Sequence, residues 1–166
     1  MSGKHEKSQY RPCVGIMLLN ARNEVWVGRR ADIAQPEGHP HWWQMPQGGI
    51  DDDEDTAAAA LRELREETGV CSATILAESA QWHYYDLPPH LQGVAWGGRW
   101  CGQRQRWFAM RFTGADSEID IGGNHGHKAE FDAWRWAPLP DLIGLIVPFK
   151  RDVYEKVVEE FRHLAA

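Results

Sequence analysis

The sequence predicts a mixed α/β (α+β) fold in which a mixed β-sheet is sandwiched between α-helices. Segments rich in β-forming residues recur along most of the chain. Two helical patterns interrupt them, one at residues 54–68 and one from Phe149 to Leu164. These two helices are expected to cover opposite faces of the sheet, because each apolar face must be buried.

The first part of the chain is expected to form a hairpin followed by a loop. Residues 13–19 and 25–27 are strand-like and flank a turn-forming segment, which predicts two paired strands. Residues 31–41 are polar and contain proline and glycine, so we expect a loop there. A short extended piece follows at residues 42–46.

Residues 54–68 carry the strongest helical signal in the sequence. Ala57 to Leu61 are good helix formers. Asp51 and Glu54 resemble a capping box, with aspartate in place of serine or threonine. Gly69 suits the left-handed position that ends many helices. These signals predict both ends of the helix.

The second part of the chain is expected to supply the remaining strands and the last helix. Residues 73–82, 104–112 and 132–136 are rich in β-forming residues. Residues 86–99 are typical of a loop. From Phe149 to Leu164, apolar residues recur at steps of four, which predicts an amphipathic helix.

Composition disfavours several classes of protein. Of the 166 residues, 43% are hydrophobic and 25% are charged, as is ordinary for a globular protein. The apolar runs fall short of the roughly 20 residues that cross a bilayer, and residues 1–11 lack the apolar core of a secretory signal. The three cysteines are scattered, which argues against a disulfide framework or a zinc site. We expect a cytoplasmic monomer with a flexible tail at residues 1–9 and a single domain at residues 10–166.

The negative charge of the protein comes from one short segment. The net charge is −6, from 18 basic and 24 acidic residues. Residues 51–67 contain eight acids and two bases, so the rest of the chain is neutral. Such a concentration of acids is either a solvated face or a binding site for cations.

Three glutamates in this segment share one helical face against local preference. Glu63, Glu66 and Glu67 stand at i, i+3 and i+4 in the last two turns of the predicted helix. Each like-charged pair costs about 0.2–0.5 kcal/mol, and the helix dipole adds roughly 0.3–1 kcal/mol against an acid in the final turn. Gly48 and Gly49 precede the helix and let backbone carbonyls approach a ligand. Carboxylates and a glycine carbonyl are the oxygen ligands that Mg²⁺ and Mn²⁺ prefer.

These residues belong to a longer pattern with fixed spacing. Gly48, Glu54, the run Arg62 to Glu67 and Gly69-Val70 match the Nudix box, G-x5-E-x7-R-E-U-x-E-E-x-G-U with U aliphatic, at every fixed position. The chain therefore resembles the Nudix hydrolases, which implies the Nudix fold. Further segments are similar to those of bacterial RNA pyrophosphohydrolases, also known as dinucleoside polyphosphate hydrolases: Tyr10 to Pro12, Trp43 to Ile50, Gln103 to Phe108, Glu130 to Trp136 and Pro148 to Tyr154.

The resemblance implies a metal-dependent attack of water on a phosphorus of a nucleoside diphosphate linked to another group. Glu63, Glu66 and Glu67 are the implied ligands of Mg²⁺ or Mn²⁺, with several ions in each site. The Gly48 carbonyl and Glu130 are implied as further ligands. Taken without this context, Glu130 is typical of an ordinary surface acid.

The resemblance also implies catalytic and structural roles. The general base stays open among Glu67, which we favour, Glu63 and Glu130. Glu54 and Arg62 are implied to form an ion pair that positions the loop and the helix.

The side chains expected to contact the substrate are basic, aromatic or amide groups in the matched segments: Arg11, Gln44, Arg104, Arg106, Phe149 and Lys150. Arg11, with Arg29 and Arg30, suits phosphate binding, although each is also typical of a surface arginine. Arg104 and Arg106 are two residues apart in a strand and therefore face one side. Phe149 either stacks on a base or belongs to the apolar stripe of the last helix. Trp43 is the tryptophan expected nearest the ligand.

The leading functional hypothesis is removal of pyrophosphate from the 5′-triphosphate end of RNA, which leaves a 5′-monophosphate. The alternative is asymmetric hydrolysis of dinucleoside polyphosphates, such as diadenosine tetraphosphate or pentaphosphate, to ATP and a smaller nucleotide. Clearance of oxidised nucleoside triphosphates fits the box but not the flanking segments. A binding module without turnover is disfavoured because no box glutamate is missing. No membrane partner is expected, and the balanced charge outside the box argues against DNA.

Overall fold

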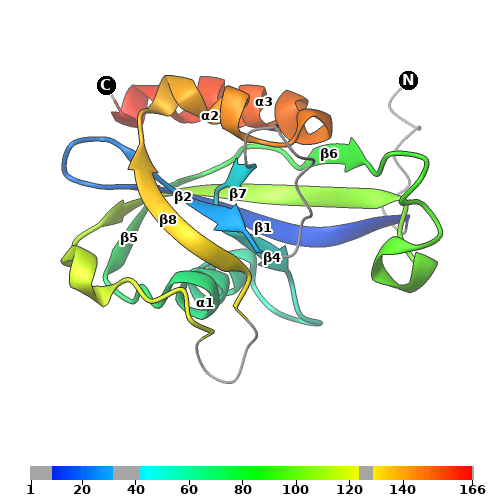
Figure 1. The fold of residues 1–166 in the computed structure, drawn as a ribbon, viewed down its shortest axis with the longest axis horizontal. Helices are drawn as coiled ribbons and strands as arrows, with labels where there is room; N and C mark the ends of the chain where they lie inside the picture. The colour runs from blue at the N-terminus through cyan, green and yellow to red at the C-terminus, as the bar shows by residue number, and fades with distance from the viewer. Residues whose placement is uncertain (1–8, 32–41, 124–128, 166) are drawn as a thin grey trace.

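The sheet is the centre of the fold in the computed structural model, which describes residues 9–31, 42–123 and 129–165. In these residues, eight strands form one mixed sheet whose main path runs β3-β2-β1-β7-β5, while β4 pairs with β1, β6 with β7 and β8 with β2 (Figure 1). The strands are β1 Tyr10–Leu19, β2 Val25–Arg30, β3 Trp43–Gln44, β4 Gln47–Gly49, β5 Ala73–Glu78, β6 His83–Asp86, β7 Gly102–Phe112 and β8 Phe131–Ala137.

The two longest strands form the middle of the sheet. β1 and β7 are parallel and stay in register from the Tyr10–Gly102 pair to the Leu19–Arg111 pair. Nearly every side chain of β1 from Cys13 onward is buried. Burial on both faces is typical of parallel strands covered by helices, and it explains why this segment reads as one apolar run.

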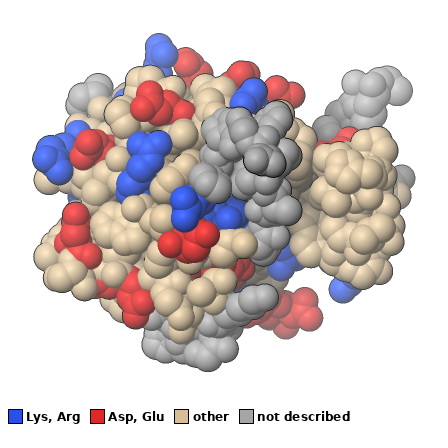
Figure 2. Space-filling model, in the orientation of Figure 1, with Lys and Arg blue, Asp and Glu red and all other residues tan. Residues whose placement is uncertain are grey.

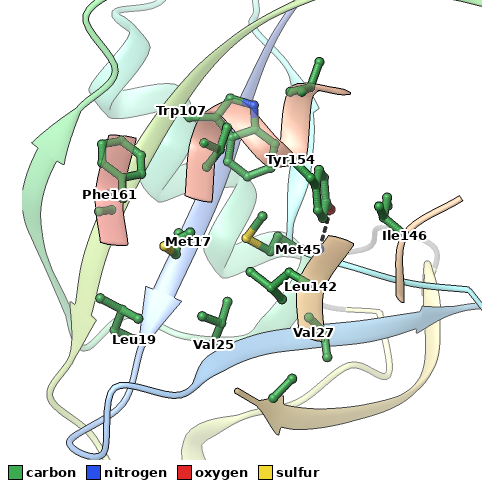
Figure 3. Packing of buried hydrophobic residues seen from close by; sticks show 14 of the residues in the cluster. Met17, Leu19, Val25, Val27, Met45, Trp107, Leu142, Ile146, Tyr154 and Phe161 are labelled. Carbon is green, nitrogen blue, oxygen red and sulfur yellow. Dashed lines mark hydrogen bonds between the residues drawn. The ribbon is translucent and has the colours of Figure 1, made fainter. Parts of the chain in front are cut away.

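Helices cover both faces of the sheet, which confirms the predicted fold class. α1 (Thr56–Thr68) lies on one face, and α2 (Leu142–Leu145) and α3 (Arg151–Phe161) lie on the other (Figure 1). Alternation along each strand sends side chains to the two faces in turn. One apolar cluster therefore packs against α1 and includes Ile16, Leu64 and Phe108. The second packs against α2 and α3 and includes Met17, Leu142 and Phe161 (Figure 3).

A buried tyrosine ties the last helix to the segment before the Nudix box. The Tyr154 hydroxyl on α3 accepts a hydrogen bond of 2.8 Å from the Met45 backbone N–H (Figure 3). Its ring meets the Trp107 indole of β7 edge to face, with centroids 5.6 Å apart. Such aromatic pairs add about 0.5–1.5 kcal/mol beyond area burial. These contacts hold α3 close to the chain that leads into the box.

The cap of α1 differs from the one that the sequence predicts. Asp55 is the N-cap, and its side chain accepts a bond of 3.2 Å from the Ala58 N–H. Glu54 does accept a bond of 3.0 Å from the Asp51 N–H, but this contact closes the turn before the helix. The prediction was wrong because two acids three residues apart form a turn as readily as a cap. Gly69, with φ 75°, ends the helix as predicted.

Other element boundaries also needed the structure. Residues 83–86 form the strand β6, which the sequence did not predict. The rest of the predicted loop, up to residue 99, contains no strand and includes a 3₁₀ turn, Ala95–Gly98. The last helix is shorter than predicted at both ends, because Pro148–Lys150 and Arg162–Ala165 form 3₁₀ turns. Residues 1–8 of the expected tail and 32–41 of the expected loop lie outside the described residues. None of the helices in the described part of the chain is long and apolar enough to cross a bilayer.

Candidate active site

A cavity of about 430 Å³ opens beside the Nudix box. Gly48 and Glu63 of the box line this cavity. Glu130, the residue just before β8, lines it as well. Basic and aromatic side chains from β1, β2, β6 and the turn before α3 also line the cavity: Arg11, Arg30, Tyr85, Phe149 and Lys150. The sheet and the turn thus bring together groups that are up to about 140 residues apart in sequence.

Gly48 is a glycine because the Glu63 carboxylate lies against its backbone. A Cβ atom on Gly48 would collide with the carboxylate carbon and both oxygens of Glu63. Any larger residue would therefore push Glu63 away from the loop. β4 holds this loop in place, since Gly48 is paired with Val14 of the central strand β1.

Glu67 is the most deeply buried acid of the box, with 7% of its surface exposed. Its Oε2 atom accepts a bond of 3.2 Å from the Gln47 backbone N–H. Its Oε1 atom is buried and has no hydrogen-bond partner among the described residues. Burial, and then the charges of Glu130 and Glu63, raise the pKa of Glu67 well above its usual range. A buried carboxylate oxygen without a partner is a ready cation ligand.

The pKa of Glu63 is also shifted by its surroundings. Burial raises its pKa to about 7, the neighbouring Arg62 charge opposes this, and Glu66 and Glu130 add to it. The acids of the box therefore destabilise one another in the metal-free protein. A bound cation would remove this repulsion, because it supplies the missing positive charge.

Arg62 joins three acids of the box, Glu54, Glu63 and Glu66, into one network. Its Nε and Nη2 atoms each donate to the Glu54 carboxylate at 2.8 Å, which is the ion pair that the resemblance implies. This fork lowers the pKa of Glu54. Nη2 also donates to the Gly49 carbonyl at 2.9 Å, and Nη1 donates to Glu63 at 3.0 Å and Glu66 at 3.1 Å. Arg62 thereby fixes the glycine loop to the helix.

The donor atoms fit a hard divalent cation, but they are not yet gathered around one point. Among the described residues, no group of three or more His, Cys, Asp or Glu side chains is arranged to hold a metal ion. Glu63 and Glu66 instead both contact the Arg62 guanidinium, at 3.0 and 3.1 Å. The unpartnered Oε1 of Glu67 and the all-oxygen donor set still match Mg²⁺ or Mn²⁺ chemistry.

Three cations share the cavity lining with the acids: Arg11, Arg30 and Lys150. Lys150 is 7% exposed, and burial, followed by the charge of Arg30, lowers its pKa to about 8. Its Nζ atom lies 5.6 Å from the centre of the Tyr85 ring and 5.9 Å from that of Phe149. The guanidinium of Arg11 lies 5.6 Å from the centre of the Trp96 ring. A polyanion entering this cavity would gain from all three charges.

Three aromatic residues line the cavity, and two of them, Tyr85 and Phe149, form what we call its aromatic wall. Tyr85 of β6 and Phe149 of the turn before α3 have ring centroids 5.7 Å apart, inclined at 48°. Phe149 lines the cavity and also packs against the apolar cluster under α3. Both roles that the sequence left open for Phe149 are thus compatible with its position.

The structure places Arg104 and Arg106 away from the residues that line the cavity. Both lie outside the cavity and share the α1 face of β7 with Phe108, because alternate residues face one side. The Arg104 guanidinium lies 4.4 Å from the centre of the Trp82 ring. Arg106 pairs with Glu78 at 2.9 Å. The sequence pattern identified their shared side correctly but not which side it was.

Two other expected contacts also lie outside the cavity lining. Gln44 is 2% exposed, and its Oε1 atom accepts a bond of 3.2 Å from Arg30, so it supports a cavity residue instead. Trp43 lies beside Arg29 and Arg135, with their guanidinium carbons 6.0 and 5.0 Å from its ring centre. Among the uncharged lining residues, sequence reasoning missed four with amide or aromatic side chains: Gln47, Tyr85, Trp96 and Gln103.

The NUDIX domain model matches residues 9–157, so the fold and the box define this chain as a member of the Nudix family. Nudix hydrolases generally use divalent metal ions such as Mg²⁺ or Mn²⁺. Two curated relatives match almost the whole chain. It is 57% identical to an RNA pyrophosphohydrolase of Agrobacterium fabrum strain C58, over 99% of both chains. It is 58% identical to an RNA pyrophosphohydrolase of Brucella abortus strain 2308, over 97% of this chain and 92% of the relative.

Solved structures support the fold at much lower identity. A C. elegans Ap4A hydrolase in a binary complex is 18% identical, with a TM-score of 0.62 over 92% of this chain and 98% of that one. An E. coli dihydroneopterin triphosphate pyrophosphohydrolase is also 18% identical, with a TM-score of 0.64 over 91% and 98%. At this identity the likeness concerns the fold alone.

Proposed function

We propose that this protein removes pyrophosphate from the 5′-triphosphate end of RNA and leaves a 5′-monophosphate. The observation that carries this proposal is the cavity, whose lining combines Glu63 of the box and Glu130 with three cations and an aromatic wall. These are the groups needed to hold a phosphate chain and a base at once. The full-length similarity to relatives named RNA pyrophosphohydrolase favours an RNA end as the substrate.

The box would hold the divalent cations. In our proposal Glu63, Glu66, Glu67 and Glu130, with the Gly48 carbonyl, bind Mg²⁺ or Mn²⁺, several ions in each site. The bound ions would lower the pKa of the attacking water and neutralise charge on the leaving phosphate. Glu67 is our first choice for the base that takes the water proton, because its buried Oε1 atom has no hydrogen-bond partner among the described residues and can accept that proton.

The cations and rings of the cavity would hold the substrate. Arg11, Arg30 and Lys150 would bind phosphate oxygens by charge-assisted hydrogen bonds, and Phe149 with Tyr85 would stack on a base. Acidic and basic side chains are intermixed on the face shown in Figure 2. This distribution supports recognition of a short charged end rather than a long stretch of nucleic acid.

The proposed substrate also sets the cellular context. Since RNA ends are the substrate, the enzyme is expected to act in the cytoplasm. We treat residues 10–166 as one catalytic domain, because the cavity is lined from β1 through the turn before α3. We propose that the enzyme is a monomer, because the exposed large apolar side chains among the described residues are few: Leu61, Leu76 and Val94.

A side-by-side rate assay tests the function. Short 5′-triphosphate RNA and diadenosine tetraphosphate are each incubated with Mg²⁺, and the phosphate products are resolved. We expect a higher kcat/KM on RNA, with a 5′-monophosphate product. Fast conversion of the dinucleotide to ATP with slow RNA turnover would overturn the proposal and place the protein among nucleotide-clearing hydrolases. Mn²⁺ in place of Mg²⁺, and chelator as the blank, complete the assay.

A further inference from the structure

A branched chain of side-chain hydrogen bonds runs from the core to the floor of the cavity. The Trp107 indole Nε1 donates to Gln105 Oε1 at 2.9 Å. Gln105 Nε2 donates to Gln47 Oε1 at 2.9 Å and to Gln103 Oε1 at 2.7 Å. Trp107 is fully buried, and Gln105 and Gln103 are 1% and 2% exposed. Gln47 and Gln103 line the cavity, whereas Gln105 lies beneath them.

The donor-to-acceptor direction of these hydrogen bonds is fixed by the chemistry of the indole group. An indole N–H donates and cannot accept, so the Gln105 atom facing Trp107 must be its carbonyl oxygen. The Gln105 amide nitrogen therefore faces the other two glutamines, and its two hydrogens match the two contacts. Gln47 and Gln103 must then turn their oxygens inward. Their own NH₂ groups have no hydrogen-bond partner among the described residues.

We infer that Trp107 and Gln105 are positioning residues that make Gln47 and Gln103 present N–H donors to acceptor atoms of the substrate. Without these hydrogen bonds, the amide of Gln47 or Gln103 could flip and present its oxygen instead, because the two orientations have nearly the same shape. Because the two amides are already oriented before the substrate binds, the binding step does not include the free-energy cost of orienting them. The inference rests on the proposed function only in taking the ligand to be a nucleotide.

The surroundings of the two glutamines indicate which ligand atoms they meet. Gln103 is paired with Arg11 on β1 and with Tyr85 on β6, so it lies between a cation and the aromatic wall. Gln47 is next to Gly48, and its backbone N–H holds Glu67. Both positions suit an acceptor oxygen of a nucleotide. That oxygen belongs either to the phosphate chain or to a keto group of a base stacked on the wall.

Gln105→Glu is the decisive variant because it has nearly the same shape and lies outside the cavity lining. A carboxylate at this position can still accept from Trp107 but can no longer donate. Gln47 and Gln103 would then turn their NH₂ groups toward it and present oxygens to the substrate. Since a bond to a charged acceptor is worth roughly ten-fold or more in affinity, we expect KM to rise at least ten-fold with a smaller change in kcat.

A neutral variant separates polarity from charge. Gln105→Met removes both the donor and the acceptor, so it frees the two glutamines without adding a charge; we expect a smaller rise in KM than for Gln105→Glu. Gln81→Glu is the matched control for one added charge, because Gln81 is exposed and outside the cavity lining. Simple repulsion would weaken between about 0.1 M and 1 M salt, whereas reversed polarity would persist. Thermal unfolding verifies that each variant is folded.

Two readouts distinguish the source of the acceptor oxygen. Tripolyphosphate binding, measured by calorimetry with Mg²⁺, needs no turnover and thus separates this inference from the proposed function. Weaker binding to Gln105→Glu, at both salt concentrations, would assign the donors to phosphate oxygens. Unchanged binding with a reduced preference for guanine over 2-aminopurine at either of the first two nucleotides of the RNA would assign them to a keto group. If KM, tripolyphosphate binding and base preference all match those of wild type and Gln81→Glu, the inference is wrong.

Discussion

Replacing Glu63 by glutamine should make the metal-free protein more stable above pH 7. The folded-state pKa of Glu63 is about 7, against 4.5 for an ordinary glutamate, with burial as the main cause. Each pH unit of this difference corresponds to about 1.4 kcal/mol, so ionising Glu63 costs the folded state about 3 kcal/mol. Glu63→Gln removes this cost while keeping the shape of the side chain and an oxygen that accepts from Arg62.

The sign of the pH dependence follows from the protons bound in each state. Between pH 4.5 and about 7, the folded protein keeps a proton on Glu63 that the unfolded chain has released. Raising the pH across this window therefore lowers the free energy of unfolding of the metal-free wild type. Glu63→Gln should lack this contribution. For a chain of this size, about 3 kcal/mol corresponds to a gain of roughly 6–12 °C in Tm above pH 7.

The assay is thermal unfolding of wild type and Glu63→Gln with chelator, at pH values from 5 to 8.5, repeated with excess Mg²⁺. We expect the variant to be more stable only without metal. Mg²⁺ should stabilise the wild type more than the variant, because the cation binds a carboxylate in the folded state. A metal-free variant that is no more stable than wild type at pH 8.5 would refute the reasoning, as would an equal effect of Mg²⁺ on both proteins.

Three further outcomes follow from the contacts of the site. Glu67→Gln should lower kcat on 5′-triphosphate RNA by about two orders of magnitude or more without unfolding the protein, which circular dichroism and rate assays check together; near-normal kcat would contradict the role of Glu67. Lys150→Met should raise KM about ten-fold and Arg104→Ala should change it little, so equal effects of the two in the same assay would show that the substrate face is misassigned. Arg62→Met should cost about 2–3 kcal/mol by breaking the partly buried fork to Glu54, and a Tm within about 1 °C of wild type would exclude that contribution.

The Nudix box and the helix that carries it could be predicted because their signals are local. The spacing of Glu63, Glu66 and Glu67 depends only on the period of one helix, and Gly69 ends that helix through its own backbone freedom. The contact of Arg62 with Glu54 across the turn before α1 was implied by the resemblance to the Nudix box rather than by their spacing alone. The two-sided covering of the sheet was predictable as well, because apolar residues must be buried on both faces.

The composition of the cavity depended on which strands pair and which face each strand turns inward. Alternation placed Arg104 and Arg106 together, but the parallel pairing of β7 with β1 under α3 decided that Gln103 and Gln105 face the cavity side. Residues 83–86 form a strand because they pair with β7, and the same pairing places Tyr85 beside Gln103. Sequence alone thus determined the chemistry of one helix and its loop. Tertiary structure decided which residues of the other strands line the cavity, because the local residue pattern does not indicate which distant strands pair.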